Sequence, residues 1–378
     1  MRVQFARPHL TGDEGQAVAE VIATGWVSQG PKVQAFEEAF AERVGAAAAI
    51  ATTSCTTALH LALHAAGIGP GDEVIVPSLS FIATANSVLH CGATPVFADI
   101  DPLTYNLDPD SAERAITPKT KAIMPVHQVG LPADMDRFLE IAQRHGLVLV
   151  EDAACAIGAR YKGTPVGSIG PITCFSLHPR KVITTGEGGM ITVSDPKLAE
   201  RIRRLRQHGM SVSDLARHST DKVVIESYPE PGFNYRMTDM QAALGLCQMT
   251  VLDHVLASRR VLAERYNAAL DSIPHLEAPY DPPYAQRTWQ SYCVRVGSRS
   301  PIGRTELMER LLADGIPTRR GVMAIHHEAA YAGTRADLPH TDAAAADALM
   351  LPLFPDLTFE EQDYVIGRLA MHVIAQAA

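Results

Sequence analysis

Short, continuously apolar runs that alternate with helical segments restrict the fold of this chain more than any other feature. The runs are Ala48–Ala51, Val74–Pro77, Pro95–Ile100, Ala122–Val126, Leu147–Val150, Ile172–Leu177 and Met190–Val193. Apolar side chains on consecutive positions are typical of strands that are buried on both faces. Strands that alternate with helices predict an α/β fold, in which helices cover both sides of a mostly parallel sheet.

Helix signals lie between several of these runs. Ser54 has the position of an N-cap for a helix that carries Leu59 and Leu63 on one face and ends at Gly67. Asp195, followed by proline, begins another helix. These signals place helices after the first and the last of the predicted strands.

The character of the sequence changes near residue 248. The segment 208–236 is polar and reads as a long loop, and loops of this length are usually functional or disordered. From about Met249 onward the pattern favours long helices with few strands, and Thr358 and Glu361 have the spacing of a capping box for a terminal helix. We therefore expect a large domain over residues 1–248 and a smaller α+β domain over residues 249–378.

Charge and composition argue against several function classes. The 378 residues include 33 Lys and Arg against 42 Asp and Glu, a net charge of −9, which disfavours nucleic-acid binding. No apolar run approaches the roughly 18 residues that span a bilayer, and the first residues lack a signal-peptide pattern. The six cysteines form no CxxC pair, which argues against a disulfide scaffold and a zinc site. We expect a cytoplasmic enzyme without a metal or a membrane partner.

A lysine between the last two predicted strands is the first candidate for chemistry. Lys181 follows Ser176 and precedes Gly186, Gly188 and Gly189, small residues that allow close approach of the backbone. A desolvated lysine amine becomes nucleophilic and suits Schiff-base formation. The alternative is an ordinary lysine in a surface turn.

Asp152 stands at the carboxyl end of the strand that begins at Leu147, where open α/β sheets place ligand-binding residues. The alternative is a cap of the following helix. Pyridoxal phosphate requires a carboxylate against its pyridine nitrogen, so Asp152 and Lys181 together supply the two groups that its chemistry needs. The helix start Ser54–Leu59 is a candidate phosphate site, or an ordinary N-cap.

These segments belong to an ordered series of motifs that resembles the DegT/StrS-type sugar aminotransferases, enzymes that use pyridoxal 5′-phosphate (PLP) and have fold type I, the aspartate-aminotransferase fold. The resemblance extends over nearly the whole chain. The matching segments are Thr24–Gly30, Ser54–Leu59, Pro77–Asn86, Gly92–Asp99, Glu151–Ala154, Cys174–Met190, Gly232–Asp239 with its continuation to Gly245, and Leu351–Pro352.

The resemblance implies roles around the cofactor ring. Lys181 would form the Schiff base with PLP and later move a proton between the substrate carbon and the cofactor. Asp152 would pair with the pyridine nitrogen, and Phe81 would lie on one face of the ring. Cys155 stands where the family often has Gln or His near the phenolic oxygen; a thiol is a weaker hydrogen-bonding group, and the alternative is a small buried filler.

The resemblance also implies a phosphate site that two subunits share. Thr56, Thr57 and Ser176 would hold the phosphate from one subunit. Asn234, in the long loop, would reach it from the other subunit, which implies a homodimer.

The implied activity is transfer of an amino group from glutamate or glutamine to a keto-sugar, most simply a nucleotide-linked one. A PLP- or pyridoxamine-dependent sugar dehydratase and a cyclitol aminotransferase are alternatives within the fold, although dehydratases of this type have lost the lysine. A non-catalytic regulatory protein is an alternative of a different class. Arg319–Arg320 and His326–Glu328 could contact a sugar or a phosphate, or have surface roles.

Overall fold

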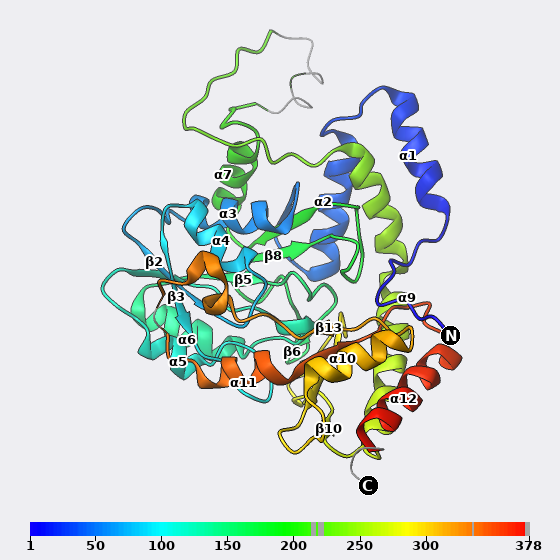
Figure 1. The fold of residues 1–378 in the computed structure, drawn as a ribbon. Helices are drawn as coiled ribbons and strands as arrows, with labels where there is room; N and C mark the ends of the chain where they lie inside the picture. The colour runs from blue at the N-terminus through cyan, green and yellow to red at the C-terminus, as the bar shows by residue number, and fades with distance from the viewer. Residues whose placement is uncertain (213–216, 218–222, 335, 375–378) are drawn as a thin grey trace.

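A seven-stranded sheet dominates the computed structural model, which describes residues 1–212, 217, 223–334 and 336–374 (Figure 1). In spatial order its strands are β1 (Ala48–Thr52), β9 (Gly189–Val193), β8 (Ile172–Ser176), β5 (Val148–Asp152), β4 (Thr120–Ile123), β2 (Glu73–Pro77) and β3 (Thr94–Ala98). The neighbours from β8 to β3 pair in parallel, and β9 runs antiparallel to both β8 and β1. The prediction of a mostly parallel sheet is confirmed, and every predicted run overlaps an observed strand.

Helices cover both faces of this sheet because successive strand residues point to opposite sides. Cys174 packs in the cluster beneath α3 (Cys55–Ala65) and α7 (Pro196–Arg206), whereas the next residue, Phe175, packs beneath α2 (Pro31–Val44) and α9 (Asp239–Leu270). The helices of this region are α1 (Asp13–Thr24), α2 (Pro31–Val44), α3 (Cys55–Ala65), α4 (Ala83–His90), α5 (Pro109–Arg114), α6 (Met135–His145) and α7 (Pro196–Arg206).

The residues that were predicted to begin helices act as N-caps in the structure. Ser54 and Thr57 form a capping box at the start of α3, and the Asp195 side chain accepts a hydrogen bond from the Lys197 amide at the start of α7. Thr358 and Glu361 exchange hydrogen bonds in the same way at the start of the terminal helix. The signals locate these helix starts because each cap satisfies amides that lack a partner within the helix.

A second, antiparallel sheet carries the C-terminal part. Its order is β10 (Leu276–Glu277), β12 (Tyr292–Val296), β14 (Ala348–Leu351) and β13 (Arg319–Arg320). A small third sheet joins β11 (Ala285–Gln286), β6 (Arg160–Tyr161) and β7 (Thr164–Pro165). The accompanying helices are α9 (Asp239–Leu270), α10 (Arg304–Ala313), α11 (Pro339–Asp347) and α12 (Phe359–Ile374), with 3-10 turns η1 (Gln128–Gly130), η2 (Ile325–His327) and η3 (Ala329–Tyr331).

The long helix α9 links the two parts of the molecule (Figure 1). Its first half packs on α1 and α2, while Leu262, Tyr266 and Leu270 from its second half join the core of the smaller sheet. The expected boundary near residue 248 therefore falls inside a continuous helix, and Val3 from the N-terminal segment also packs in the smaller core. The two-domain division remains a prediction.

None of the helices in the described ranges combines the length and the apolar character needed to cross a membrane.

Candidate active site

The carboxyl ends of β5 and β8 bring the predicted site residues together. Asp152 is the last residue of β5 and Ser176 the last of β8, and these strands are parallel neighbours. The loop from β8 to β9 carries Lys181, whose amide donates to the His178 carbonyl oxygen at 2.8 Å. Parallel strands place their carboxyl ends at one edge of the sheet, so the position of the site follows from the topology.

The Lys181 amine lies against a thiol. Its Nζ donates a hydrogen bond to Cys155 Sγ at 3.2 Å. Burial acts to lower the pKa of Lys181, but Cys155, then Cys55 and Asp152, favour the ammonium form, and the net effect is a raised pKa. The amine is therefore protonated without a carbonyl partner, and it must lose a proton before it can act as a nucleophile.

The Asp152 carboxylate is held in one orientation. It is 4% exposed; Oδ2 accepts a hydrogen bond from Thr84 Oγ1 at 2.8 Å, and Oδ1 accepts one from the Ala154 amide at 3.1 Å. Thr84 Oγ1 in turn lies 2.7 Å from Ser80 Oγ. The Ala154 bond is cap-like, but turns rather than a helix follow Asp152. The orientation of the carboxylate is thus set by β5 and α4 together.

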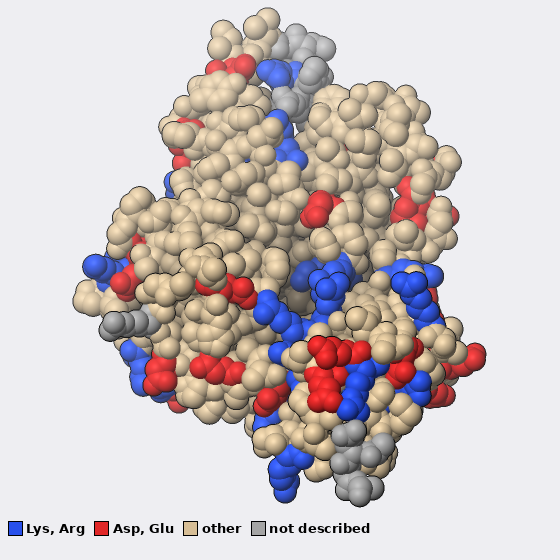
Figure 2. Space-filling view, in the orientation of Figure 1, with Lys and Arg blue, Asp and Glu red and all other residues tan. Residues whose placement is uncertain are grey.

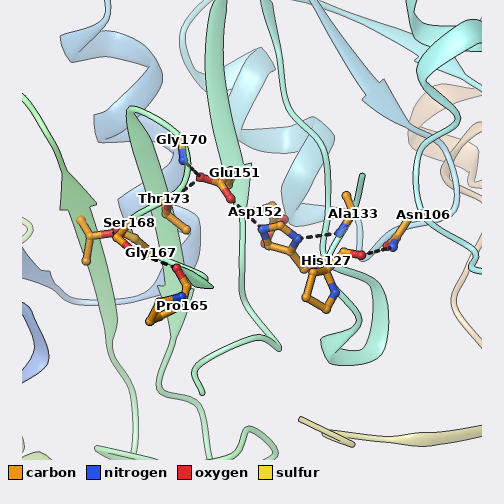
Figure 3. Close-up of polar contacts among 12 residues, drawn as sticks. Asn106, His127, Ala133, Glu151, Asp152, Pro165, Gly167, Ser168, Gly170 and Thr173 are labelled. Carbon is orange, nitrogen blue, oxygen red and sulfur yellow. Dashed lines mark hydrogen bonds and ion pairs between the residues drawn. The ribbon is translucent and has the colours of Figure 1, made fainter. Parts of the chain in front are cut away.

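A buried hydrogen-bonded pair lies on the face of β5 opposite to Asp152 (Figure 3). Glu151 Oε2 lies 2.9 Å from His127 Nε2, and both side chains are fully buried. Glu151 Oε1 accepts hydrogen bonds from the Gly170 amide and from Thr173 Oγ1 at 2.9 and 2.8 Å. Because His127 Nδ1 accepts the Ala133 amide at 3.0 Å, the bonding pattern assigns the ring proton to Nε2. The pair ties β5 to the segments that flank it.

The N-terminus of α3 is the candidate phosphate site. The Thr57 amide donates to Ser54 Oγ at 3.2 Å, and Thr57 Oγ1 accepts the Ser54 amide at 3.0 Å, so both Thr57 groups belong to the capping box. The Cys55 and Thr56 amides precede the first helical hydrogen bond and point along the positive end of the helix. A Cβ at Gly189 would collide with the backbone of Ser54 and Cys55, so glycine allows this helix start to lie directly on β9.

Phe81 and Cys155 are the remaining candidates for contact with the ring of a cofactor. Phe81 precedes α4 and is 65% exposed, an unusual state for a phenyl ring next to buried polar groups. The Cys155 backbone carbonyl accepts a hydrogen bond from Thr288 Oγ1 at 2.8 Å, while its thiol contacts Lys181. The thiol therefore has a polar neighbour in Lys181, and its place near the phenolic oxygen of PLP stays a prediction.

Asn234 lies closer to its own chain's helix α3 than its sequence position indicates. It forms a bridge with Gln207, and the carbonyl of the next residue, Tyr235, accepts the Thr53 amide at 3.1 Å. The part of the long loop at 213–216 and 218–222 lies outside the described residues. The role of Asn234 across a dimer interface stays a prediction.

The sequence argument missed Thr84, which contacts the Asp152 carboxylate, and it missed the pair of His127 and Glu151 that supports β5 from the other face. His127 follows β4 just as Asp152 ends β5, so the rule on carboxyl ends of strands could have found it. Thr84 lies inside the quoted motif Pro77–Asn86, but no sequence signal pairs it with Asp152. A cavity between α2, β1 and α7 has none of the predicted site residues in its lining.

The chain is similar to known aminotransferases over nearly its whole length. The model of the DegT/DnrJ/EryC1/StrS aminotransferase family matches residues 8–370. The chain is 45% identical to GDP-perosamine synthase of Caulobacter vibrioides over 97% of both chains. It superposes on DesV of S. venezuelae with a TM-score of 0.91 at 36% identity over 98% of both chains. The PLP form of the putative sugar aminotransferase Spr1654 from Streptococcus pneumoniae gives a TM-score of 0.92 at 29% identity over the whole of both chains.

Together with these matches, the amine and the carboxylate at the strand ends and the nearby helix N-terminus identify a PLP-dependent aminotransferase of fold type I. The protein belongs to the DegT/DnrJ/EryC1/StrS aminotransferase family. The predicted family, fold class, enzyme class and cofactor are thereby confirmed. The residues also fit PLP chemically, because Lys181 matches its aldehyde, Asp152 its ring nitrogen and the α3 N-terminus its phosphate.

Proposed function

We propose that this protein transfers an amino group from glutamate or glutamine to a keto-sugar that is linked to a nucleotide. The observation that carries the proposal is the Lys181 amine at the strand ends, close to an Asp152 carboxylate that Thr84 and Ala154 hold in place. The name of the relative GDP-perosamine synthase, at 45% identity, supports a nucleotide-linked sugar as substrate.

The chemistry divides between the cofactor and the chain. PLP supplies an electron sink and carries the amino group between the two substrates. Lys181 Nζ would hold the cofactor and, when free, would move a proton to or from the substrate carbon. The Asp152 carboxylate keeps a proton on the ring nitrogen through its negative charge.

The surrounding residues would bind the phosphate of the cofactor and orient its ring. Thr56, Thr57 and Ser176 would bind the phosphate at the α3 N-terminus, and the capping box of Ser54 and Thr57 fixes this helix start. Phe81 would pack on one face of the bound ring, and the Cys155 thiol would lie near its phenolic oxygen. Asn234 completes the phosphate site from the second subunit of a homodimer.

A half-reaction screen tests the proposal. The enzyme is loaded with pyridoxamine phosphate and offered UDP-, GDP- and dTDP-linked keto-sugars, and the return of the PLP absorption band is followed. We expect at least one nucleotide-linked keto-sugar to restore the band and to yield an amino-sugar. A separate screen of glutamate, glutamine, aspartate and alanine identifies the donor in the opposite half-reaction.

The outcomes separate this proposal from its alternatives. A response to free cyclitol ketones alone would replace the nucleotide-linked substrate by a cyclitol. A dehydrated sugar without nitrogen would identify a dehydratase. Lys181→Ala serves as the control, because it removes the amine while the fold and the phosphate site remain.

A further inference from the structure

Two arginine side chains meet at the ring of Phe5, where the N-terminal segment crosses the smaller sheet. The guanidinium carbon of Arg180 lies 5.7 Å from the ring centroid, and that of Arg319 lies 5.8 Å from it. The three residues come from the N-terminal segment, the loop before Lys181 and β13. Figure 2 shows Lys and Arg side chains gathered around a hollow near the centre of this face.

These two guanidinium groups lack an acidic partner within the part of the chain that the structure describes. Arg320, the neighbour of Arg319 on β13, pairs with Glu328 at 3.0 Å. No described carboxylate forms an ion pair with Arg180 or Arg319, although the main chain of Arg180 is fixed by a 2.7 Å hydrogen bond from Gln290 Nε2 to its carbonyl oxygen. Two cations on one ring with no carboxylate between them favour an anion from outside the chain.

Each of the two arginines belongs to a segment that borders the active site. Arg180 directly precedes Lys181, whose amine contacts Cys155. On the other side, β13 leads into a segment that docks beside the site, because the Ser80 amide donates to the Met323 carbonyl at 3.2 Å, just before Phe81. An anion held between the arginines therefore lies beside the site in which the substrate reacts.

We propose that Arg180 and Arg319, with Phe5 between them, form a subsite for an anionic group of the substrate. The proposal rests on the proposed function, since the ligand is part of a substrate of the aminotransferase. Planar guanidinium groups bind the paired oxygens of phosphates and carboxylates, and the Phe5 ring stacks against them by cation–π contact. A phosphate comes from the diphosphate of a nucleotide-linked keto-sugar, whereas a carboxylate comes from the amino donor.

Binding to the PLP-loaded full-length protein distinguishes the two sources without turnover. Isothermal titration uses UDP and GDP as diphosphate probes and glutarate as a dicarboxylate that lacks an amine. We expect Arg319→Gln and Arg180→Gln each to raise the Kd of one class of probe about tenfold or more, the effect of losing a charged hydrogen bond. A loss confined to UDP and GDP assigns the diphosphate, and a loss confined to glutarate assigns the donor carboxylate.

Matched variants separate the subsite from general charge effects. Arg320→Gln removes a neighbouring positive charge that is already paired, and we expect it to leave all three affinities unchanged. Arg180→Lys keeps the charge without the planar fork, and we expect an intermediate loss. The PLP absorption band reports in every variant whether the site around Lys181 is intact.

The subsite is overturned if the wild-type protein binds none of the three probes. It is also overturned if both glutamine variants, with their PLP bands intact, bind UDP, GDP and glutarate as the wild type does. Failure of the wild type to aminate any nucleotide-linked keto-sugar overturns the proposed function instead. The arginine-dependent binding of a probe would then still support the subsite.

Discussion

At the scale of single residues, charge and hydrogen bonding at Asp152 set the chemistry of the site. Asp152→Asn keeps the shape and the Thr84 contact but removes the negative charge. We expect the variant to bind PLP and to perform the donor half-reaction about 10²–10³-fold more slowly, the range for removing one electrostatic partner of a developing charge. PLP occupancy and stopped-flow half-reaction rates are measured separately; a near-normal rate would remove Asp152 from the catalytic set.

Lys181 is tested by its covalent chemistry. We expect borohydride reduction of the PLP-loaded protein, followed by peptide mapping, to find the cofactor on Lys181 alone. Lys181→Ala should lose turnover entirely and retain the wild-type circular dichroism spectrum, because the loop backbone is held by other residues, as in the Thr185 amide bond to Leu177. A label on another lysine would refute the assignment.

Thr84 is a positioning residue that acts through Asp152. Thr84→Val keeps the side-chain shape and removes the hydroxyl that donates to Oδ2. The loss of a hydrogen bond to a charged group is expected to cost about 1.5–3 kcal/mol, seen as weaker PLP binding or a slower half-reaction. Thr84→Ser keeps the hydroxyl and should recover most of the loss. Equal behaviour of the two variants would mean that packing, and not the hydrogen bond, is what matters here.

The sequence predicted Lys181 and Asp152 because each has a residue type that PLP chemistry requires, at a position that parallel strands dictate. It could not predict that Thr84 bonds Asp152 or that His127 bonds Glu151. Their roles depend on which side chains face each other across the sheet edge, and a single sequence does not encode that pairing locally. The structure adds that the Thr57 hydroxyl takes part in the capping box, and its contact with the phosphate stays a prediction.

At the scale of elements, Glu151 connects strands β5 and β8 with the segment after β4. Glu151→Leu leaves the Gly170 and Thr173 donors without their acceptor and removes the partner of His127. We expect the variant to be destabilised by about 3–5 kcal/mol, because three buried donors lose their acceptor at roughly 1–3 kcal/mol each. The urea midpoint measures this loss.

A double variant measures how much of the stability loss comes from leaving His127 without its partner Glu151. His127→Leu combined with Glu151→Leu replaces both polar groups by apolar ones, and it should be more stable than Glu151→Leu alone. A double variant that is less stable than the single one would show that His127 contributes mainly through the Ala133 amide.

The strands were predictable as elements because residues buried on both faces leave a continuous apolar run. The predicted domain boundary at residue 248 falls inside helix α9, and this position has a physical cause. Helix α9 changes the core that it faces while its backbone hydrogen bonds continue, and composition reports the change of core but not the continuity. The two-residue strands β10 and β13 are too short to carry a periodicity.

At the scale of the whole molecule, the open question is whether one subunit completes the site of another. The contact between the Tyr235 carbonyl and the Thr53 amide allows Asn234 to serve its own chain's phosphate site. The dimer proposal instead assigns Asn234 to the partner's site. A two-fold assembly would then create two identical, shared sites.

Mixing two inactive variants decides between these arrangements. If Asn234 serves the partner, a heterodimer of Lys181→Ala and Asn234→Ala has one site with both defects and one intact site. Random pairing after joint unfolding and refolding should then restore about one quarter of wild-type activity, because half of the dimers are mixed and each has one intact site. A mixture of Lys181→Ala with Asp152→Asn is the control and should restore nothing, since both residues belong to one chain's site. If the first mixture also stays inactive although mass spectrometry detects heterodimers, Asn234 serves its own subunit.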